Sequence, residues 1–500
     1  MCGLTLTIST LAHASQPSNA ALVRSLHAAN SARGPNSQGL YTRRVQTPAG
    51  QILVSLSASV LGLRGEGVTA QPLVGKRGVL GWNGQVFSGL DVAPNENDTR
   101  VIFDKLEAGE SPSDVLQAIE GPFAFIYLST FILSSSRSAE ARRQGVPMRA
   151  LNGGEAGVVH LSELSLGHGD SIDFEQAVRL ISPSNRVATV NTVAAPEVNL
   201  GAEPALAECD AFIENLLASV RRRVENIPAP VPGCIPVGEP IELVNVAFEE
   251  PRKENQRSGR QQPPSVATYN VPDRVSGRDA VLELQSACPG RDFQFVEVNV
   301  TVEESRNFRQ SIVDVMYPSN TEMDISLAYP LYFASRGQGI IKHPDGTETP
   351  HVVTAKVYIS GLGADEQLGG YSRHRRAFER ASWIGLQDEV QMDLDRIPLR
   401  NLSRDDRVIS SHARDARYPY LDLGFINYVS SLPIWQKCNF SLGPGHGDKL
   451  LIRLAAERCG LHLTSHRVKR AMQFGTKSAK LQESRPRGFN AGAQVIQDIA

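Results

Sequence analysis

The hydrophobic pattern of this chain changes near its middle, and this change constrains the fold more than any other feature. Up to about Pro183, apolar and polar residues alternate in short runs such as QILVSLSASVLGLRG and GPFAFIYLSTFILSSS. Alternation with period two is typical of strands with one buried face, so this half predicts layered antiparallel sheet with a few helices. From Ile241 onward, IELVNVAF is a nearly continuous apolar run, as expected of a parallel strand buried on both faces.

The second half alternates strands with helices. FQFVEVNV and VVTAKVYIS read as further strands, each followed by a helical segment, which predicts a doubly wound α/β domain. Between the halves lie an amphipathic helix, with Phe212 and Leu216 on its apolar face, and a proline-rich stretch. The sequence therefore predicts a domain over residues 1–183, a linker over 184–240 and a second domain over 241–490.

Composition excludes several classes of function. The formal net charge of −2 gives no reason to expect nucleic acid or an anionic membrane as a partner. No apolar run approaches the roughly 18 residues of a membrane-spanning helix. The cysteines are scattered, with no C-x-x-C pair, which argues against a zinc site or a disulfide framework and for a reducing, cytoplasmic location. They are Cys2, Cys209, Cys234, Cys288, Cys438 and Cys459.

Cys2 is the first candidate catalytic residue. Removal of Met1 would leave its thiol and a free α-amine on one residue, directly before a strand-like run from Leu4 to Ser9. An α-amine has a pKa of about 7.7–8.0, so part of it is an unprotonated base at neutral pH. Such a residue supplies both a nucleophile and a base, although ten residues alone fit an ordinary strand start better.

Other segments of the first domain carry candidates with two interpretations each. In WNGQVF, Asn83 and Gly84 form a favoured hairpin turn or offer two donors to an oxyanion. Arg64 in LGLRGEG forms a surface ion pair or clamps a carboxylate. Asp98 in NENDTRVIF caps a helix or holds an ammonium group.

The second domain carries its own candidates in GLGADEQLGGYSRHR, which follows a strand at the edge where α/β sheets bind ligands. Glycines there let the backbone approach a ligand, and Asp365 and Glu366 offer oxygen ligands to Mg²⁺ near phosphates. The same two carboxylates would equally cap the next helix.

Taken in order, MCG, RGPNS, LRGEGVTAQP, WNGQVFSG and NDT resemble the glutaminase domain of class II, N-terminal-nucleophile glutamine amidotransferases. SGLGADEQLGGYSRH, RDDRVISSHARDARYPYLD, GDKLLIRLAA and KRAMQFG resemble the synthetase domain of asparagine synthetases. The most similar subgroup is that of the asparagine synthetase domain-containing proteins. The resemblance implies an Ntn-hydrolase-type αββα domain followed by an adenine-nucleotide α-hydrolase-like α/β domain.

The resemblance also implies roles. Cys2 would attack the amide of glutamine, Asn83 and Gly84 would form the oxyanion hole, and Arg64 and Asp98 would bind the substrate's α-carboxylate and α-ammonium. The ammonia would then pass to the second domain.

In that domain, family members activate aspartate with ATP and Mg²⁺ and convert it to asparagine. There Gly361, Gly363 and Lys449 would contact the nucleotide or adenylate, and Asp365 would bind the metal. Glutamine, aspartate and ATP are thus the expected small-molecule partners, and a homodimer is compatible with the resemblance.

Three departures from the family pattern concern mainly the second domain. The Ser-Gly-Gly-x-Asp-Ser pyrophosphate loop expected before IELVNVAF is absent, together with its strand. FILSSS stands where Ala-Arg-Asp-x-x-Gly-Arg-Arg is expected, and Leu362 replaces a family glutamate. A shortened gene model or splice form would explain the gaps, and so would decay of the synthetase half. The leading hypothesis is a glutamine amidotransferase that resembles asparagine synthetase, and the alternatives are an impaired scaffold or regulatory protein and an amidotransferase with another acceptor.

Overall fold

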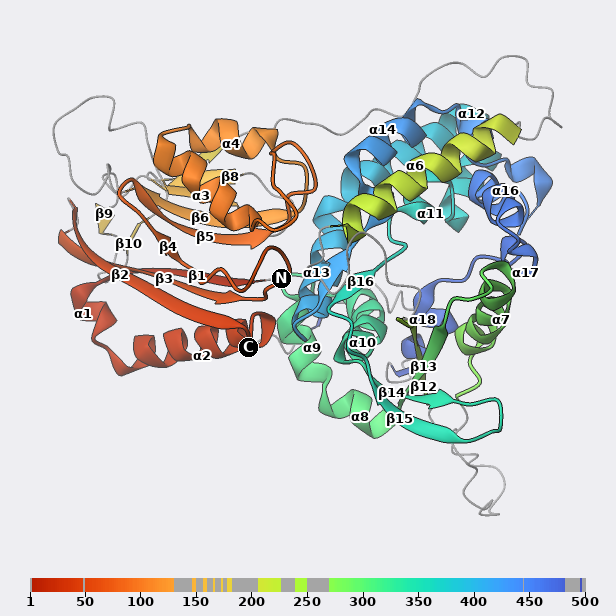
Figure 1. Cartoon of the computed structure of the whole chain (residues 1–500), viewed down its shortest axis with the longest axis horizontal. Coiled ribbons are helices and arrows are strands. Elements are labelled where there is room, and N and C mark those ends of the chain that lie inside the picture. The colour runs from red at the N-terminus through yellow and green to blue at the C-terminus, as the bar shows by residue number, and fades with distance from the viewer. Residues whose placement is uncertain are drawn as a thin grey trace. The chain divides into compact units, whose positions relative to one another are not determined.

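The structure is a computed structural model, and it divides into two units that are described separately (Figure 1). The first unit comprises residues 1–186 and 222–233, and the second comprises 187–221 and 234–500. The predicted boundaries at 183 and 240 stay predictions. The residues that the structure describes are 2–47, 50–129, 146–149, 156–159, 165–166, 172–173, 178–181, 206–225, 239–249, 269–443, 445–481 and 495–496. FILSSS and the proline-rich stretch lie outside them.

Two antiparallel sheets form the first unit. One has the strand order β1-β3-β2 and the other has the order β11-β8-β7-β6-β5-β4, while β9 and β10 form a separate pair. The strands are β1 (Gly3–Thr10), β2 (Ser37–Thr47), β3 (Gly50–Val60), β4 (Leu73–Val74), β5 (Gly78–Gly84), β6 (Phe123–Ser129), β7 (Val146–Arg149), β8 (Ala156–Val159), β9 (Ser165–Leu166), β10 (Ile172–Asp173) and β11 (Val178–Ile181).

Apolar side chains hold the layers of the first unit together. Leu56 on β3 packs with Val79 on β5 and Leu128 on β6, so the two sheets face each other across one core. The second core joins Trp82 on β5 to Ile102 on α3 (Asp98–Ala108), and it includes α4 (Pro112–Ala118). Helices α1 (Leu11–Ala14) and α2 (Pro17–Arg33) run along the other sheet (Figure 1). The described layers therefore follow the order helix, sheet, sheet, helix, and both sheets are antiparallel, as the alternating sequence pattern predicts.

The second unit is a mixed α/β structure with its parallel strands in two pairs. Strand β12 (Ile241–Phe248) pairs in parallel with β13 (Phe293–Val300). On its other edge, β13 pairs antiparallel with β14 (Gln338–Lys342), and β14 pairs antiparallel with β15 (Glu348–Val352). Strand β16 (Val357–Ile359) pairs in parallel with β17 (Asp415–Arg417) in another sheet. The mixed α/β class agrees with the prediction, but the expected doubly wound sheet is divided among the described residues.

A side chain, in place of a backbone ladder, connects the two parallel pairs. The Glu242 carboxylate at the start of β12 accepts hydrogen bonds from the backbone N–H groups of Thr354 and Ala355, shortly before β16. No described strand pairs with the second edge of β12. The two parallel pairs therefore stay in separate sheets, because no backbone segment among the described residues extends the ladder beyond β12.

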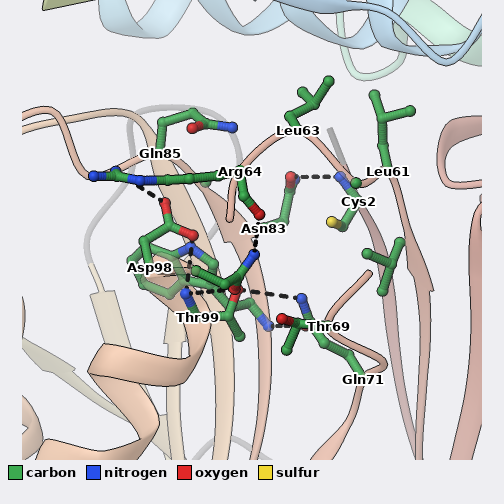
Figure 2. A pocket seen from close by; sticks show the side chains of 15 residues that line it. Cys2, Leu61, Leu63, Arg64, Thr69, Gln71, Asn83, Gln85, Asp98 and Thr99 are labelled. Carbon is green, nitrogen blue, oxygen red and sulfur yellow. Dashed lines mark hydrogen bonds and ion pairs between the residues drawn. The ribbon is translucent and has the colours of Figure 1, made fainter. Parts of the chain in front are cut away.

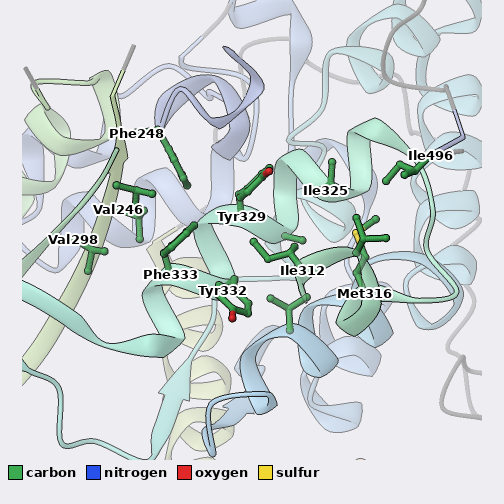
Figure 3. Packing of buried hydrophobic residues seen from close by; sticks show 14 residues of the cluster. Val246, Phe248, Val298, Ile312, Met316, Ile325, Tyr329, Tyr332, Phe333 and Ile496 are labelled. Atoms are coloured by element: carbon green, nitrogen blue, oxygen red, sulfur yellow. The ribbon is translucent and has the colours of Figure 1, made fainter. Parts of the chain in front are cut away.

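Helices surround these sheets. Phe248, Phe333 and Ile312 belong to the largest core of the unit, between β12, α10 and α9 (Figure 3). Phe212, predicted on the apolar face of the linker helix, is fully buried and packs edge-to-face on Phe425. No described helix combines the length and apolarity needed to cross a membrane. The helices are α6 (Leu206–Val224), α7 (Pro272–Ala287), α8 (Val302–Asn307), α9 (Arg309–Met316), α10 (Glu322–Arg336), α11 (Ala364–Gln367), α12 (Ser372–Arg396), α13 (Ser403–Ser410), α14 (Leu423–Ser431), α15 (Ile434–Lys437), α16 (Leu450–Arg458), α17 (His462–Ser465) and α18 (Met472–Gly475).

Candidate active site

Cys2 lies at the start of β1, which pairs with β3 from Gly3 onward. Its backbone nitrogen donates a 2.8 Å hydrogen bond to Oδ1 of Asn83 on β5 (Figure 2). This bond joins the first residue of one sheet to a strand of the other, because β1 and β5 lie on facing sheets. The nitrogen that becomes the α-amine once Met1 is removed is therefore held in a defined place.

A pocket opens beside Cys2, and its empty space, open solvent at the mouth included, is about 410 Å³. The structure places every sequence-predicted residue of the first domain on its wall (Figure 2). These residues are Cys2, Arg64, Asn83, Gly84 and Asp98. They come from four separate stretches of the sequence, because Asn83 and Gly84 are adjacent, so folding of the unit is needed to gather them.

Asn83 and Gly84 do not form a hairpin turn. Both belong to β5, where Asn83 pairs with Ala124 and Gly84 with Phe123 of β6. The ladder therefore rules out the type I′ turn that the dipeptide favours locally. A Cβ atom on residue 84 would lie 2.6 Å from the Pro122 carbonyl oxygen, so close packing already requires glycine there.

Arg64 is buried, and the expected surface ion pair is wrong. Its Nη2 atom donates to the Val92 carbonyl at 3.3 Å, and Nη1 donates to the Val86 carbonyl. Nη1 also lies 3.8 Å from Oδ2 of Asp98, with both side chains only 5% exposed. Two backbone carbonyls and one carboxylate thus fix the guanidinium at the pocket wall, where it is desolvated and its charge interacts strongly.

Asp98 is not the N-cap of α3. Asn97 takes that position, and its side chain accepts a hydrogen bond from the Thr99 N–H. Asp98 lies in the first turn, where Oδ2 accepts from the Val86 N–H at 3.1 Å and Oδ1 accepts from Thr99. Its carboxylate is therefore positioned by backbone N–H donors at the N-terminus of α3.

Sequence reasoning missed Gln85, which follows Gly84 directly and also lines the pocket. The side chain is 6% exposed, and Oε1 has no hydrogen-bond partner among the described residues. A buried amide oxygen without a partner costs about 1–3 kcal/mol, which a ligand donor would recover. The signal available in the sequence was its position next to the two oxyanion candidates.

A second polar cluster surrounds Asp365 in the second unit. Nζ of Lys449 lies 3.2 Å from Oδ1 of Asp365, and Nζ of Lys469 donates to Oδ2. Burial acts to raise the pKa of the Asp365 carboxyl, but the two ammonium groups outweigh it and hold the pKa below its ordinary value. Lys469 was not predicted as a site residue, although it lies in the motif KRAMQFG.

The predicted cap and metal roles of this cluster fit poorly. Gly363 is the N-cap of α11 and no side chain caps that helix end. Glu366 is buried and accepts hydrogen bonds from the Tyr371 hydroxyl and the Asn401 amide. Its carboxylate is therefore not a second metal ligand beside Asp365. Within the described part of the chain, no three His, Cys, Asp or Glu side chains gather as a metal site. One carboxylate held by two ammonium groups does not fit Mg²⁺ by itself.

The glycines beside this cluster differ in what packing requires of them. Gly363 has a φ of 102°, and a Cβ there would lie 2.5 Å from Leu421, so glycine is required. A Cβ on Gly361 would meet no atom within 4 Å, so packing does not require glycine at that position. Leu362 packs against the cluster of Ile409, Ala416 and Tyr418 and has no acid–base chemistry.

Comparison with known proteins agrees with the resemblance read from the motifs. The family model for asparagine synthase matches residues 379–488. The asparagine synthetase domain-containing protein 1 of Bos taurus is 32% identical over 628 residues, covering 97% of this chain and 96% of the relative. The chain belongs to the family of asparagine synthetase domain-containing proteins. The predicted family is thus confirmed.

Other members of the family match over similar spans. The human asparagine synthetase domain-containing protein 1 is 31% identical, covering 97% of this chain and 96% of the relative. An asparagine synthetase domain-containing protein of Saccharomyces cerevisiae is 28% identical, covering 93% and 90%. The bovine and human matches extend over 628 residues, whereas this chain has 500. Well over a hundred aligned positions of those relatives therefore have no residue in this member of the family.

Proposed function

We propose that the first unit hydrolyses the side-chain amide of glutamine to glutamate and ammonia, with Cys2 as the nucleophile. The observation that carries the proposal is the shared pocket of Cys2, Asn83, Gly84, Arg64 and Asp98. This reaction needs a nucleophile, two hydrogen-bond donors, a guanidinium and a carboxylate. All of these groups line the same pocket.

The contacts near the thiol support a separate part in the proposed reaction for each group. After Met1 removal, the α-amine takes the thiol proton, directly or through a water, and Sγ attacks the amide carbon. Because Oδ1 of Asn83 already accepts from the Cys2 nitrogen, its Nδ2 is the atom left to donate into the pocket. Nδ2 and the Gly84 N–H then stabilise the oxyanion, and the protonated α-amine returns its proton to the amide nitrogen, so ammonia leaves. Water then hydrolyses the thioester to glutamate and the free thiol.

The opposite part of the pocket suits the α-amino acid end of glutamine. The Arg64 guanidinium pairs with the α-carboxylate. The Asp98 carboxylate and the unsatisfied Oε1 of Gln85 accept from the α-ammonium. Arg64 and Asp98 together have no net charge, which matches a zwitterionic ligand.

The decisive experiment measures glutamate release from glutamine by the full, Met1-processed chain. Cys2→Ala is expected to abolish release, because no other described thiol lines the pocket. Cys288→Ala is the matched control, since Cys288 is an exposed thiol outside the pocket. Undiminished release by Cys2→Ala would refute the proposal.

The acceptor of the ammonia depends on the reaction that the second unit catalyses. Family membership supports aspartate as the acceptor, which ATP would activate for conversion to asparagine. The proposed location is the cytoplasm, and a homodimer is compatible with the proposal. Lys449, Lys469 and the open backbone at Gly361 fit the phosphates of a nucleotide. ATP–pyrophosphate exchange in the presence of aspartate tests this half of the proposal.

A second candidate function for this unit is a scaffold or regulatory protein that has lost the synthetase reaction. The observations that favour it are the apolar packing of Leu362 where the family has a glutamate, and the missing pyrophosphate loop. Exchange above the level of an Asp365→Asn variant would exclude this candidate.

A further inference from the structure

A side-chain amide takes the place of a backbone acceptor at the edge of β5. Strand β4 pairs with β5 through Leu73 and Val74. The same register, continued by two residues, would set Gln71 opposite Trp82. Oε1 of Gln71 accepts a 2.7 Å hydrogen bond from the Trp82 N–H. Because a buried backbone N–H needs a partner, this bond holds the Gln71 side chain against β5, one residue before Asn83.

The same amide reaches the first turn of α3. Its Nε2 atom donates to Oγ1 of Thr99 at 3.5 Å, and Thr99 directly follows Asp98 (Figure 2). Gln71 and Thr99 are each only 3% exposed, and both line the pocket. One buried amide therefore bridges the strand that carries Asn83 and the helical turn that carries Asp98.

A second hydrogen bond joins the strand segment to the same turn on the other side of Asn83 and Gly84. Val86 follows the end of β5 by two residues, and its N–H donates to Oδ2 of Asp98 at 3.1 Å. One such bond would let the turn pivot about it, whereas bonds on both sides fix its distance and its direction. The separation of the oxyanion donors from the Asp98 carboxylate is therefore set on both sides.

We propose that Gln71 sets the span between the oxyanion donors and the α-amino-acid end of the substrate, and thereby selects glutamine over a shorter amide. The inference rests on the proposed function of the first unit. Gln71 is a positioning residue, because its amide bonds to protein atoms on both sides and acts on the substrate through Asn83 and Asp98.

Asparagine is the informative competitor. It has the same α-amino-acid end and the same amide as glutamine, but it is one methylene shorter. When asparagine is bound at Arg64 and Asp98, its amide carbon stops short of Cys2 and the oxyanion donors. One methylene in a matched site is worth about 10–200-fold in kcat/KM.

The test compares amide hydrolysis of glutamine and asparagine by the full, Met1-processed chain. Enzyme in excess over labelled amide makes slow release from asparagine measurable. Thr99→Val removes the hydroxyl that accepts from Gln71 at nearly constant volume. The kcat/KM for glutamine should fall by about tenfold and that for asparagine should not fall, so the preference for glutamine drops by about the same factor. Thr99→Ser keeps the hydroxyl and should keep the wild-type preference.

Gln71→Met removes both hydrogen bonds of the amide, so it should lower the preference by more than Thr99→Val does. Ile102→Val is the matched control for lost stability, because Ile102 packs with Trp82 in the core between β5 and α3. It should lower the free energy of unfolding and leave the preference unchanged. Thr99→Val keeps the bond to β5, so it stays decisive if Gln71→Met fails to fold.

The outcomes separate this inference from the function on which it rests. Failure of the wild-type chain to release glutamate would refute the proposed function. Release by wild type with an unchanged preference in Thr99→Val would overturn the role of Gln71 alone. The same holds if both amides lose kcat/KM equally, if Thr99→Ser loses the preference as Thr99→Val does, or if release from asparagine stays undetectable in every variant.

Discussion

The two polar clusters of this chain differ in how completely each forms a site. In the first unit, the nucleophile, the oxyanion donors and the two charged groups line one pocket, with Cys2 joined to Asn83 by a hydrogen bond. In the second unit, Asp365 is bound by two lysines, Glu366 by Tyr371 and Asn401, and Leu362 by apolar side chains. In both clusters the charged groups pair with neighbouring protein atoms, but the first cluster also lines a pocket.

This difference teaches that family membership and site completeness are separate observations. The chain aligns with its relatives over both units, and among the described residues the five predicted site residues of the first unit line one pocket. Four variants test the comparison, in order of decreasing expected effect.

The largest expected effect is on the stability of the second unit, and it tests whether glutamate release by the first unit is independent of that stability. Arg274, at the start of α7, is fully buried and bonds Glu297, Asn299 and Asn245 at 2.6–2.8 Å. Arg274→Met leaves the Glu297 carboxylate buried with less charge compensation, so the free energy of unfolding of the second unit should fall by about 3–5 kcal/mol.

Denaturant unfolding of the folded chain at low temperature measures this change. Arg278→Met is the matched control, because Arg278 pairs with the same Glu297 but is 38% exposed; we expect a loss below about 1 kcal/mol. Glutamate release at temperatures where the variant remains folded should equal that of wild type. A parallel loss of release would show that the two units do not act separately.

The next effect concerns the oxyanion. Asn83→Ala removes Nδ2 and also the acceptor for the Cys2 nitrogen, so kcat for glutamate release should fall by about 10²–10³, with a smaller change in KM. Steady-state kinetics measure the two constants. A change confined to KM would contradict the assignment of Asn83 to the oxyanion.

A smaller effect concerns substrate binding. Arg64→Met removes the guanidinium that pairs with the α-carboxylate, so KM for glutamine should rise by about 10–100-fold while kcat changes less. Arg77→Met, on the loop between β4 and β5 and outside the pocket, is the control. A fall in kcat at unchanged KM would instead place Arg64 in the chemical step.

The smallest effect is a dependence of stability on pH that belongs to the second unit. Burial and the charges of Arg336 and Arg414 lower the pKa of His412 to about 4, against about 6.5 in the unfolded chain. Between these values the unfolded chain binds more protons, so stability falls as the pH drops from about 6.5 to 4, by about 1 kcal/mol per pH unit. His412→Gln should flatten this part of the profile in thermal melts, and an unchanged slope would show that another group causes it.

Local patterns determined much of the fold of this chain. The alternating run at its start predicts a strand, and β1 spans Gly3–Thr10. IELVNVAF predicts a parallel strand buried on both faces. β12 pairs in parallel with β13 along its whole length, but only its last three residues are fully buried. The helix predicted from Phe212 and Leu216 is α6. These features depend on the period of apolar side chains, which a short stretch of consecutive residues is enough to show.

Long-range pairing decided what local sequence could not. Asn83-Gly84 favours a turn by its own propensity, but the ladder to β6 keeps it in a strand. Arg64 and Asp98 become neighbours, and Lys449 and Lys469 meet on Asp365, across separations that no window of sequence spans. The amino-acid sequence by itself determined the element types, the family and the candidate residues. Tertiary structure alone decided which polar groups face a cavity and which are already neutralised, because burial and partner choice depend on atoms that folding brings from distant parts of the chain.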